Sequence, residues 1–102
     1  MVQTEEIKRL DRDSKIENIV EGEIVEIVGI NSKDQREKAR IEHFDSVANL
    51  VLVGTRVSAE SVELSTYFIT PFGVKQGTVK QTYSKPSPQF EKYDALLKEA
   101  GI

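Results

Sequence analysis

The chain has 102 residues, of which 38% are hydrophobic and 30% charged, so it holds enough apolar surface for one folded domain and too much for a disordered chain. It contains no cysteine, which excludes a disulfide framework and a thiolate zinc site, and its net charge of −3 argues against a tight, non-specific duplex binder. It has no apolar run of about 18 residues and its charged N-terminus is unlike a signal peptide, so we expect a cytoplasmic protein with no membrane partner.

Residues 1–16 are predicted to be a helical segment, centred on "TEEIKRL". Thr4 can cap this helix, and the two glutamates that follow it suit the positive end of the helix dipole. Ile7 and Leu10 then lie on one apolar stripe, before "DRDS" breaks the pattern.

Five short strands are predicted within residues 17–84, because runs rich in Val and Ile alternate with turn residues there. The third of them is the most apolar, and we expect it to be buried and to end at Gly54. The predicted strands are residues 21–30, 38–44, 47–54, 61–69 and 74–83.

Alternation along two of these strands predicts which side chains face the core. In the second strand Ala39, Ile41 and His43 share one face, and the intervening residues Arg40, Glu42 and Phe44 share the other. In the fourth strand we expect Val62, Leu64 and Phe68 to point inward, with Glu63 and Ser65 outward.

The C-terminal residues 87–101 are predicted to form a helix after the proline-marked joint "SKPSP". Ser87 can cap it, Pro88 suits its first position, and Gly101 can end it. An apolar face at helical spacing should pack on the strands, and it consists of Phe90, Tyr93, Leu97 and Ala100.

These elements predict a single all-β domain over residues 1–102 with a helix at each end. Five strands within about 60 residues are too few for two packed sheets, and they close best into one strongly bent antiparallel barrel.

The basic residues are unevenly distributed along the chain. From Leu64 to Phe90 there is no acidic residue, while Lys75, Lys80 and Lys85 are present. A locally basic surface can hold phosphate in a protein of negative net charge, but lysines also protect the edges of sheets, and both interpretations remain open.

The sequence gives no sign of catalytic or metal chemistry. His43 is the only histidine, so a transition-metal site would need several carboxylates around one imidazole. No strained G-x-S-x-G elbow and no glycine-rich phosphate loop is present. We therefore expect no enzymatic activity, no metal and no cofactor.

The stretch from Ser32 to Leu52, "SKDQREKARIEHFDSVANLVL", resembles the first signature of the Sm-like (LSm/Hfq) superfamily. In that signature a bent strand carries a small residue, a hydrophobic residue and an Asp, and an Asn followed by an apolar run comes four residues after the Asp. The corresponding residues here are Ala39, Ile41, Asp45 and Asn49, followed by "LVL". The segment "IEHFD" is also similar to bacterial Hfq, and "RVSAESVELSTYFITP" loosely resembles its next two strands. The chain resembles the short divergent Sm-like proteins of phages, including cyanophages, more than it resembles cellular members of the superfamily.

The resemblance implies a ring of roughly five to seven identical subunits with single-stranded RNA bound at a central pore. Asn49 would offer its amide to a base, and Asp45 would hold the loop in shape. An alternative remains open, in which "FDSVAN" is a tight turn whose Asp and Asn cap backbone amides.

Several positions depart from the family pattern. The base-stacking position falls on Val47, which has no aromatic face, and the expected Arg-Gly pair falls on Thr70 and Pro71. Phe72 could supply the stacking instead, worth about 1–3 kcal/mol per base, or it could pack in the barrel.

We therefore expect a homo-oligomeric ring that binds single-stranded RNA, or DNA, in nucleic-acid processing. Two alternatives are a barrel that binds proteins, such as a phage assembly component, and a monomeric single-stranded DNA binder of the OB type. Besides Asp45, Val47, Asn49, Thr70 and Phe72, the residues expected to contact nucleic acid are Arg36, Lys38, Arg40, Lys75 and Lys80.

Overall fold

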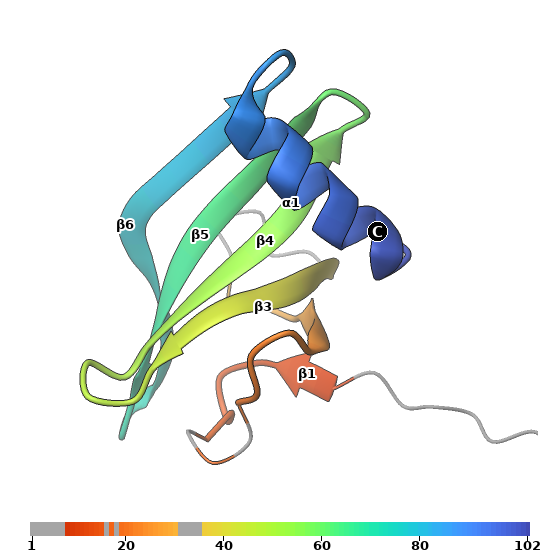
Figure 1. Ribbon diagram of the computed structural model, residues 1–102. Helices are drawn as coiled ribbons and strands as arrows, with labels where there is room; N and C mark the ends of the chain where they lie inside the picture. The colour runs from red at the N-terminus through yellow and green to blue at the C-terminus, as the bar shows by residue number, and fades with distance from the viewer. Residues whose placement is uncertain (1–7, 16, 18, 31–35) are drawn as a thin grey trace, which may run out of the picture.

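A computed structural model describes residues 8–15, 17, 19–30 and 36–102 of the chain. Within these residues the protein forms one six-stranded sheet and one α-helix (Figure 1). No described helix is long and apolar enough to cross a membrane. The elements are β1 (Lys8–Leu10), β2 (Ile24–Ile27), β3 (Glu37–Asp45), β4 (Leu50–Ser58), β5 (Ser61–Thr70), β6 (Gly73–Ser84) and α1 (Pro88–Glu99).

The strands lie in the sheet in the order in which they occur in the sequence, β1 to β6. β1 is parallel to β2, and every other neighbouring pair is antiparallel. The mostly-β prediction is confirmed, and each of the five predicted strands overlaps one of β2 to β6. The sheet is open, however, with β1 and β6 at its edges, where the sequence predicted a closed five-stranded barrel.

The first strand stands where the end of the N-terminal helix was predicted. Lys8–Leu10 pairs with Val25–Ile27, and Leu10 is buried beside β2. The prediction of a helix is therefore wrong for residues 8–10, because pairing with a distant strand outweighs the local helical pattern. Residues 11–15 of the predicted segment 1–16 form a turn and no helix, and residues 1–7 and 16 lie outside the described residues.

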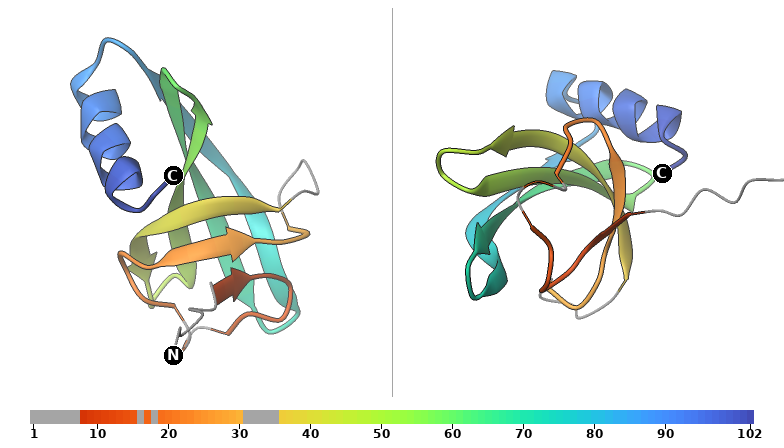
Figure 2. Two further views of the ribbon diagram at one scale, coloured as in Figure 1. Left: turned by 90° about the vertical axis from the view of Figure 1, so that its right-hand side faces the viewer. Right: turned by 90° about the horizontal axis from the view of Figure 1, so that it is seen from below.

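The sheet curls around one apolar core to which all six strands contribute (Figure 2). Burial of each such side chain stabilises the fold by about 1.5–3 kcal/mol relative to exposure. Tyr67 belongs to this core, and burial, followed by the nearby Glu37 and Glu63 carboxylates, raises the pKa of its hydroxyl to about 12. The buried core residues are Leu10, Val25, Ile27, Ala39, Ile41, Val51, Val53, Tyr67, Ile69 and Val74.

A β-bulge in β3 changes the predicted inward and outward positions. Ala39 and Ile41 are fully buried as expected, but the register with β4 shifts between Ile41 and His43. The extra residue rotates the rest of the strand, so His43 is exposed and Phe44 packs against the core. The prediction that His43 shares the inner face is therefore wrong.

β4 and β5 differ from their predictions in where they end and which residues they bury. β4 continues through Gly54, the predicted end, to Ser58. In β5, Val62 and Leu64 are buried as predicted, but Phe68 is 39% exposed. Tyr67 and Ile69 enter the core instead, because the sheet buries one face of β5 near Val62 and the opposite face near Ile69.

The predicted C-terminal helix is present as α1, which ends at Glu99, so that Ala100 caps the helix and does not belong to its buried face. The Ser87 hydroxyl accepts a hydrogen bond from the Phe90 backbone N–H at 3.1 Å, and Pro88 occupies the first helical position. α1 lies across the outer side of the curled sheet (Figure 2). Phe90 and Leu97 are buried there against Val62 of β5.

An ion pair fastens α1 to the sheet beside these apolar contacts. The Arg56 guanidinium of β4 donates to the Asp94 carboxylate at 2.6 Å and to the Ile102 carbonyl oxygen at 3.1 Å. Lys98 adds a second ion pair to Asp94 at 3.1 Å. The hydrogen bond from Arg56, followed by that from Lys98, outweighs desolvation and lowers the pKa of Asp94 below its usual range.

Candidate nucleic-acid interface

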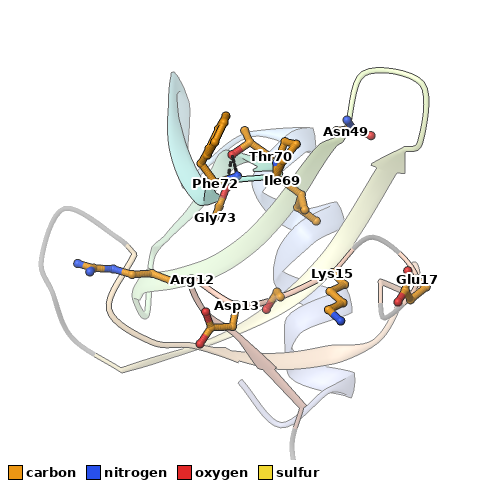
Figure 3. A pocket seen from close by; sticks show the side chains of 11 residues that line it. Arg12, Asp13, Lys15, Glu17, Asn49, Ile69, Thr70, Phe72 and Gly73 are labelled. Carbon is orange, nitrogen blue, oxygen red and sulfur yellow. Dashed lines mark hydrogen bonds between the residues drawn. The ribbon is translucent and has the colours of Figure 1, made fainter.

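Three segments that are distant in sequence border one groove of about 750 Å³. They are the segment after β1, the end of the β3–β4 turn, and the β5–β6 turn. Figure 3 shows Thr70, Phe72 and Gly73 grouped together, Asn49 apart from them, and Arg12, Asp13, Lys15 and Glu17 along the segment after β1, with Arg12 near Gly73. The volume lies within the range of about 300–1,000 Å³ that is typical of ligand sites.

Asp45 shapes the β3–β4 turn by accepting hydrogen bonds from the backbone. One of its carboxylate oxygens accepts from the N–H groups of Val47 at 3.0 Å and Ala48 at 3.2 Å. The side chain of Val47 is 95% exposed at the tip of this turn. Asp45 therefore stabilises the turn, and this local role accounts for an acidic residue at the end of a strand.

Asn49 ends the same turn in the left-handed backbone region, with φ at 55°. Asparagine tolerates this conformation better than Val or Leu, which explains an amide residue next to a buried strand. Its backbone carbonyl oxygen accepts a hydrogen bond from the Ile69 N–H at 2.9 Å, which connects the turn to β5. Asn49 also lines the groove, so its structural role and a role in binding are compatible.

The β5–β6 turn consists of Pro71 and Phe72 and is braced by the hydroxyl of Thr70. This hydroxyl donates to the Gly73 carbonyl oxygen at 2.6 Å and accepts from the Phe72 N–H at 3.2 Å. Phe72 is 94% exposed, so it does not pack in the sheet. A large exposed aromatic side chain on a braced turn is suited to stacking against a planar partner.

The segment after β1 folds into its own turn and reaches the β5–β6 turn. The Asp11 carboxylate accepts from the Asp13 N–H at 2.9 Å, and the Ser14 hydroxyl accepts from the Asp11 N–H at 2.9 Å. Gly73 has φ at 120°, and a β-carbon added there would lie 3.2 Å from the Arg12 carbonyl oxygen. Glycine at this position therefore permits the close approach of the two backbones.

Charged side chains of both signs occupy the rim of the groove. Arg12 and Lys15 are exposed, and so are Asp13 and Glu17. Two cations beside an aromatic ring and an amide can bind a phosphate, a base face and a base edge together. The two carboxylates offset the two cations in the net charge of the rim. An anion would therefore be attracted by contact with an individual cation more than by the overall charge of the groove.

The groove unites only part of the predicted binding set, namely Asn49, Thr70 and Phe72. Asp45 and Val47 lie on the adjoining turn, and Lys75 is exposed two residues beyond Gly73, on the outer face of β6. Three other predicted cations pair with carboxylates, in Arg36–Glu26 at 3.4 Å, Arg40–Glu42 at 2.5 Å and Lys80–Glu63 at 3.4 Å.

Lys38, the remaining predicted cation, is exposed on β3 and does not line the groove. Sequence reasoning missed Arg12 and Lys15, which fall in the segment expected to end a helix. Their position depends on the pairing of β1 with β2, and no local pattern signals it. Among the described residues, no three His, Cys, Asp or Glu side chains gather as metal ligands.

Comparison of the chain with protein-family models, with curated proteins and with solved structures finds no match. The assignment of a function therefore rests on the geometry of the groove and its surroundings.

Proposed function

We propose that the protein binds single-stranded nucleic acid, RNA in preference to DNA, in the groove between the β3–β4 turn, the β5–β6 turn and the segment after β1. The observation that carries this proposal is the exposure of Phe72, at 94%, on the border of a groove that Asn49, Arg12 and Lys15 also line. An exposed ring contributes nothing to the core, and burying it against a base would stabilise a complex by about 1–3 kcal/mol.

In this proposal each side chain has a distinct role. Phe72 stacks on a base, and the Asn49 amide donates to and accepts from the edge of that base or the next one. Arg12 and Lys15 neutralise phosphates, and the two carboxylates on the rim disfavour a closely packed duplex backbone. Single strands are favoured because their bases can turn toward a ring on a turn, whereas paired bases are stacked inside a helix.

A ring of roughly five to seven copies belongs to the same proposal, in which each groove repeats around a central pore. The feature that supports it is the open edge of β6, which runs for 12 residues in the described sheet. An unpaired edge of this length presents a row of backbone donors and acceptors that a neighbouring subunit could satisfy.

The test is a titration of fluorescently labelled oligouridine and of the matching DNA at low and high salt. The charge-removing double variant Arg12→Ser/Lys15→Ser is compared with the native chain. Each lost phosphate contact reduces the slope of log affinity against log salt by about 0.7, so the double variant should lose about 1.4.

A matched control removes two exposed cations away from the groove, in Lys38→Ser/Lys92→Ser. This control should keep the native slope. Equal losses in both double variants would mean that only the total charge matters, and no binding at low salt would refute the proposal.

The second candidate function is protein binding through the same β6 edge. β6 contains no acidic residue, so an acidic extended peptide could add a strand to the sheet there. This function predicts that binding of such a peptide survives Phe72→Ser and Arg12→Ser/Lys15→Ser, because β6 beyond Gly73 lies outside the groove.

A further inference from the structure

The outer face of the sheet is covered by α1 over only one of its halves. Around Val62, α1 packs closely and buries Phe90 and Leu97. The other half, near the two turns, carries Leu50, Leu52, Thr66 and Phe68 on the same face, as the register of β4 and β5 requires. Thr66 is buried at 7%, but Leu50 and Leu52 are half-buried and Phe68 is 39% exposed, so among the described residues an apolar part of the sheet around Leu50 and Phe68 is incompletely covered.

One row of directly paired residues crosses this uncovered half from β3 to β6. Asp45 pairs with Leu50, Leu50 pairs with Phe68, and Phe68 pairs with Lys75. Residues that are direct partners in neighbouring antiparallel strands point to the same side of a sheet. The row therefore has an acid at one end, two apolar side chains in the middle and a base at the other end.

This order of side chains is complementary to itself. We propose that a second copy of this chain packs face to face on the uncovered half. The two copies are related by a two-fold axis that lies between the two sheets, above the line midway between β4 and β5, and runs parallel to these strands. Such an axis reverses the row, so Asp45 of each copy faces Lys75 of the other and Leu50 faces Phe68. Two-fold interfaces require this kind of self-complementary surface.

Where two sheets pack they lie about 10 Å apart, and neighbouring strands lie about 4.8 Å apart. Leucine and phenylalanine side chains fill a gap of this size in β-sandwiches, and a lysine can reach a carboxylate across its rim. The contact is limited to the row near the two turns, because the same axis places the α1 helices of both copies at the Val62 end of the shared face and the two sheets must diverge toward that end.

Both charged groups of the row are available to a second copy. Lys75 is exposed and makes no ion pair with any described residue. Asp45 uses one carboxylate oxygen to hold the β3–β4 turn, which leaves its second oxygen for the partner. A nucleic acid on this face would gain from Lys75 but would be repelled by Asp45, so charge favours a second copy.

The contact uses neither the groove nor the β6 edge, so it goes beyond the proposed function and can fail independently of it. If copies also join edge to edge in rings, the face contact joins two rings. Variants that break it then halve the measured mass instead of reducing it to that of a monomer.

The test is the mass of the native chain and its variants by sedimentation equilibrium over a wide range of protein concentration. The native chain should associate with an even number of copies. Phe68→Ser and Lys75→Glu should each raise the dissociation constant of the face contact by about tenfold or more, since each change occurs twice in one interface.

The decisive variant is the charge swap Asp45→Lys/Lys75→Glu, which should restore association by recreating the complementary pair in reverse. Because loss of Asp45 weakens the turn, Asp45→Asn provides a second check. It retains an oxygen for the turn, removes the charge, and should weaken association less than Lys75→Glu, which creates repulsion.

Phe72→Ser and Lys38→Glu are matched controls that change an aromatic ring and a lysine outside the row, and they should leave the mass unchanged. Circular dichroism verifies that each variant is folded. A monomeric native chain, or a mass that is unaffected by both Phe68→Ser and Lys75→Glu, would overturn the proposal. It would also be overturned if these variants lowered only oligonucleotide affinity, since the face would then bind nucleic acid.

Discussion

Phe72 and Phe90 mark two contrasting regions of the molecule. Phe90 of α1 is 1% exposed and packs against Val62, whereas Phe72 of the β5–β6 turn is 94% exposed. The same residue type therefore stabilises the fold in one region and is left in solvent in the other. A fold that hides one ring and exposes another on a braced turn has a ring available for a partner.

The backbone around the two rings differs as well. α1 begins and ends with standard helix caps, which need only local residues. The groove is bordered by Asn49 and Gly73, both at positive φ, and by Arg12 from a distant segment. Of these residues, Asn49 is the one that its φ strains, because it is not a glycine, and the hydrogen bond from the Ile69 N–H to its backbone carbonyl oxygen holds it there.

The largest expected effect comes from Phe90→Ala. Removal of a buried ring should lower the free energy of unfolding by about 3–5 kcal/mol, because it leaves a cavity between α1 and the sheet. Chemical denaturation measures this change. Phe72→Ala is the matched control, and its effect on stability should stay within about 0.5 kcal/mol. Similar losses for the two variants would contradict the contrast between the two regions.

Gly73→Ala should cost about 1–3 kcal/mol, since alanine is strained at φ 120° and its β-carbon would press on the Arg12 carbonyl oxygen. Gly101→Ala is a suitable control, because Gly101 also has positive φ, at 79°, but has nothing within 4 Å of the added carbon. Thermal unfolding of both variants separates the strain of alanine at positive φ from the clash with the Arg12 carbonyl oxygen. Equal losses would show that the close approach at the groove contributes nothing.

Two substitutions separate the backbone role of Asn49 from the role of its side chain. Asn49→Ala should cost about 1 kcal/mol, because alanine disfavours the left-handed region, and Asn49→Gly should leave stability nearly unchanged. If the amide contacts a base, both variants lose oligouridine affinity to a similar degree. Native affinity in Asn49→Gly would assign the amide to the turn alone.

The smallest expected effect concerns the ion pair that fastens α1. Because the pKa of Asp94 is lower in the folded chain than its unfolded value near 3.8, its contribution to stability is present above about pH 4. It is lost as the pH falls through the folded-state value. The difference in stability between the native chain and Asp94→Asn should therefore be constant near neutral pH and shrink in acid.

Denaturation midpoints from neutral pH to about pH 3 measure this dependence. In an Arg56→Met background, which removes the main hydrogen-bond donor to Asp94, Asp94→Asn should have a smaller and less pH-dependent effect. An equally pH-dependent difference in that background would assign the effect to another group.

Features that depend on neighbouring residues could be predicted from the sequence. Ser87, Pro88 and the spacing of Phe90 and Leu97 specify α1 without information from the rest of the chain. The Pro71 turn and the apolar runs of β4 and β5 are local in the same sense.

Features that depend on pairing between distant strands could not be predicted. β1 is a strand because β2 pairs with it, and Phe44 faces the core because β3 has a bulge. The groove likewise contains residues that the sequence could predict and residues that it could not. Asn49 and Phe72 stand out in the sequence as turn residues, whereas Arg12 joins them only after the sheet curls.

Binding of single-stranded nucleic acid in the groove can be observed residue by residue, by mapping the backbone amide NMR signals of the protein during addition of oligouridine. We expect the largest shifts at Arg12, Lys15, Asn49 and Phe72, with little change in α1. Shifts confined to α1 or to the outer face around Phe68, or no shifts at low salt, would contradict binding in the groove.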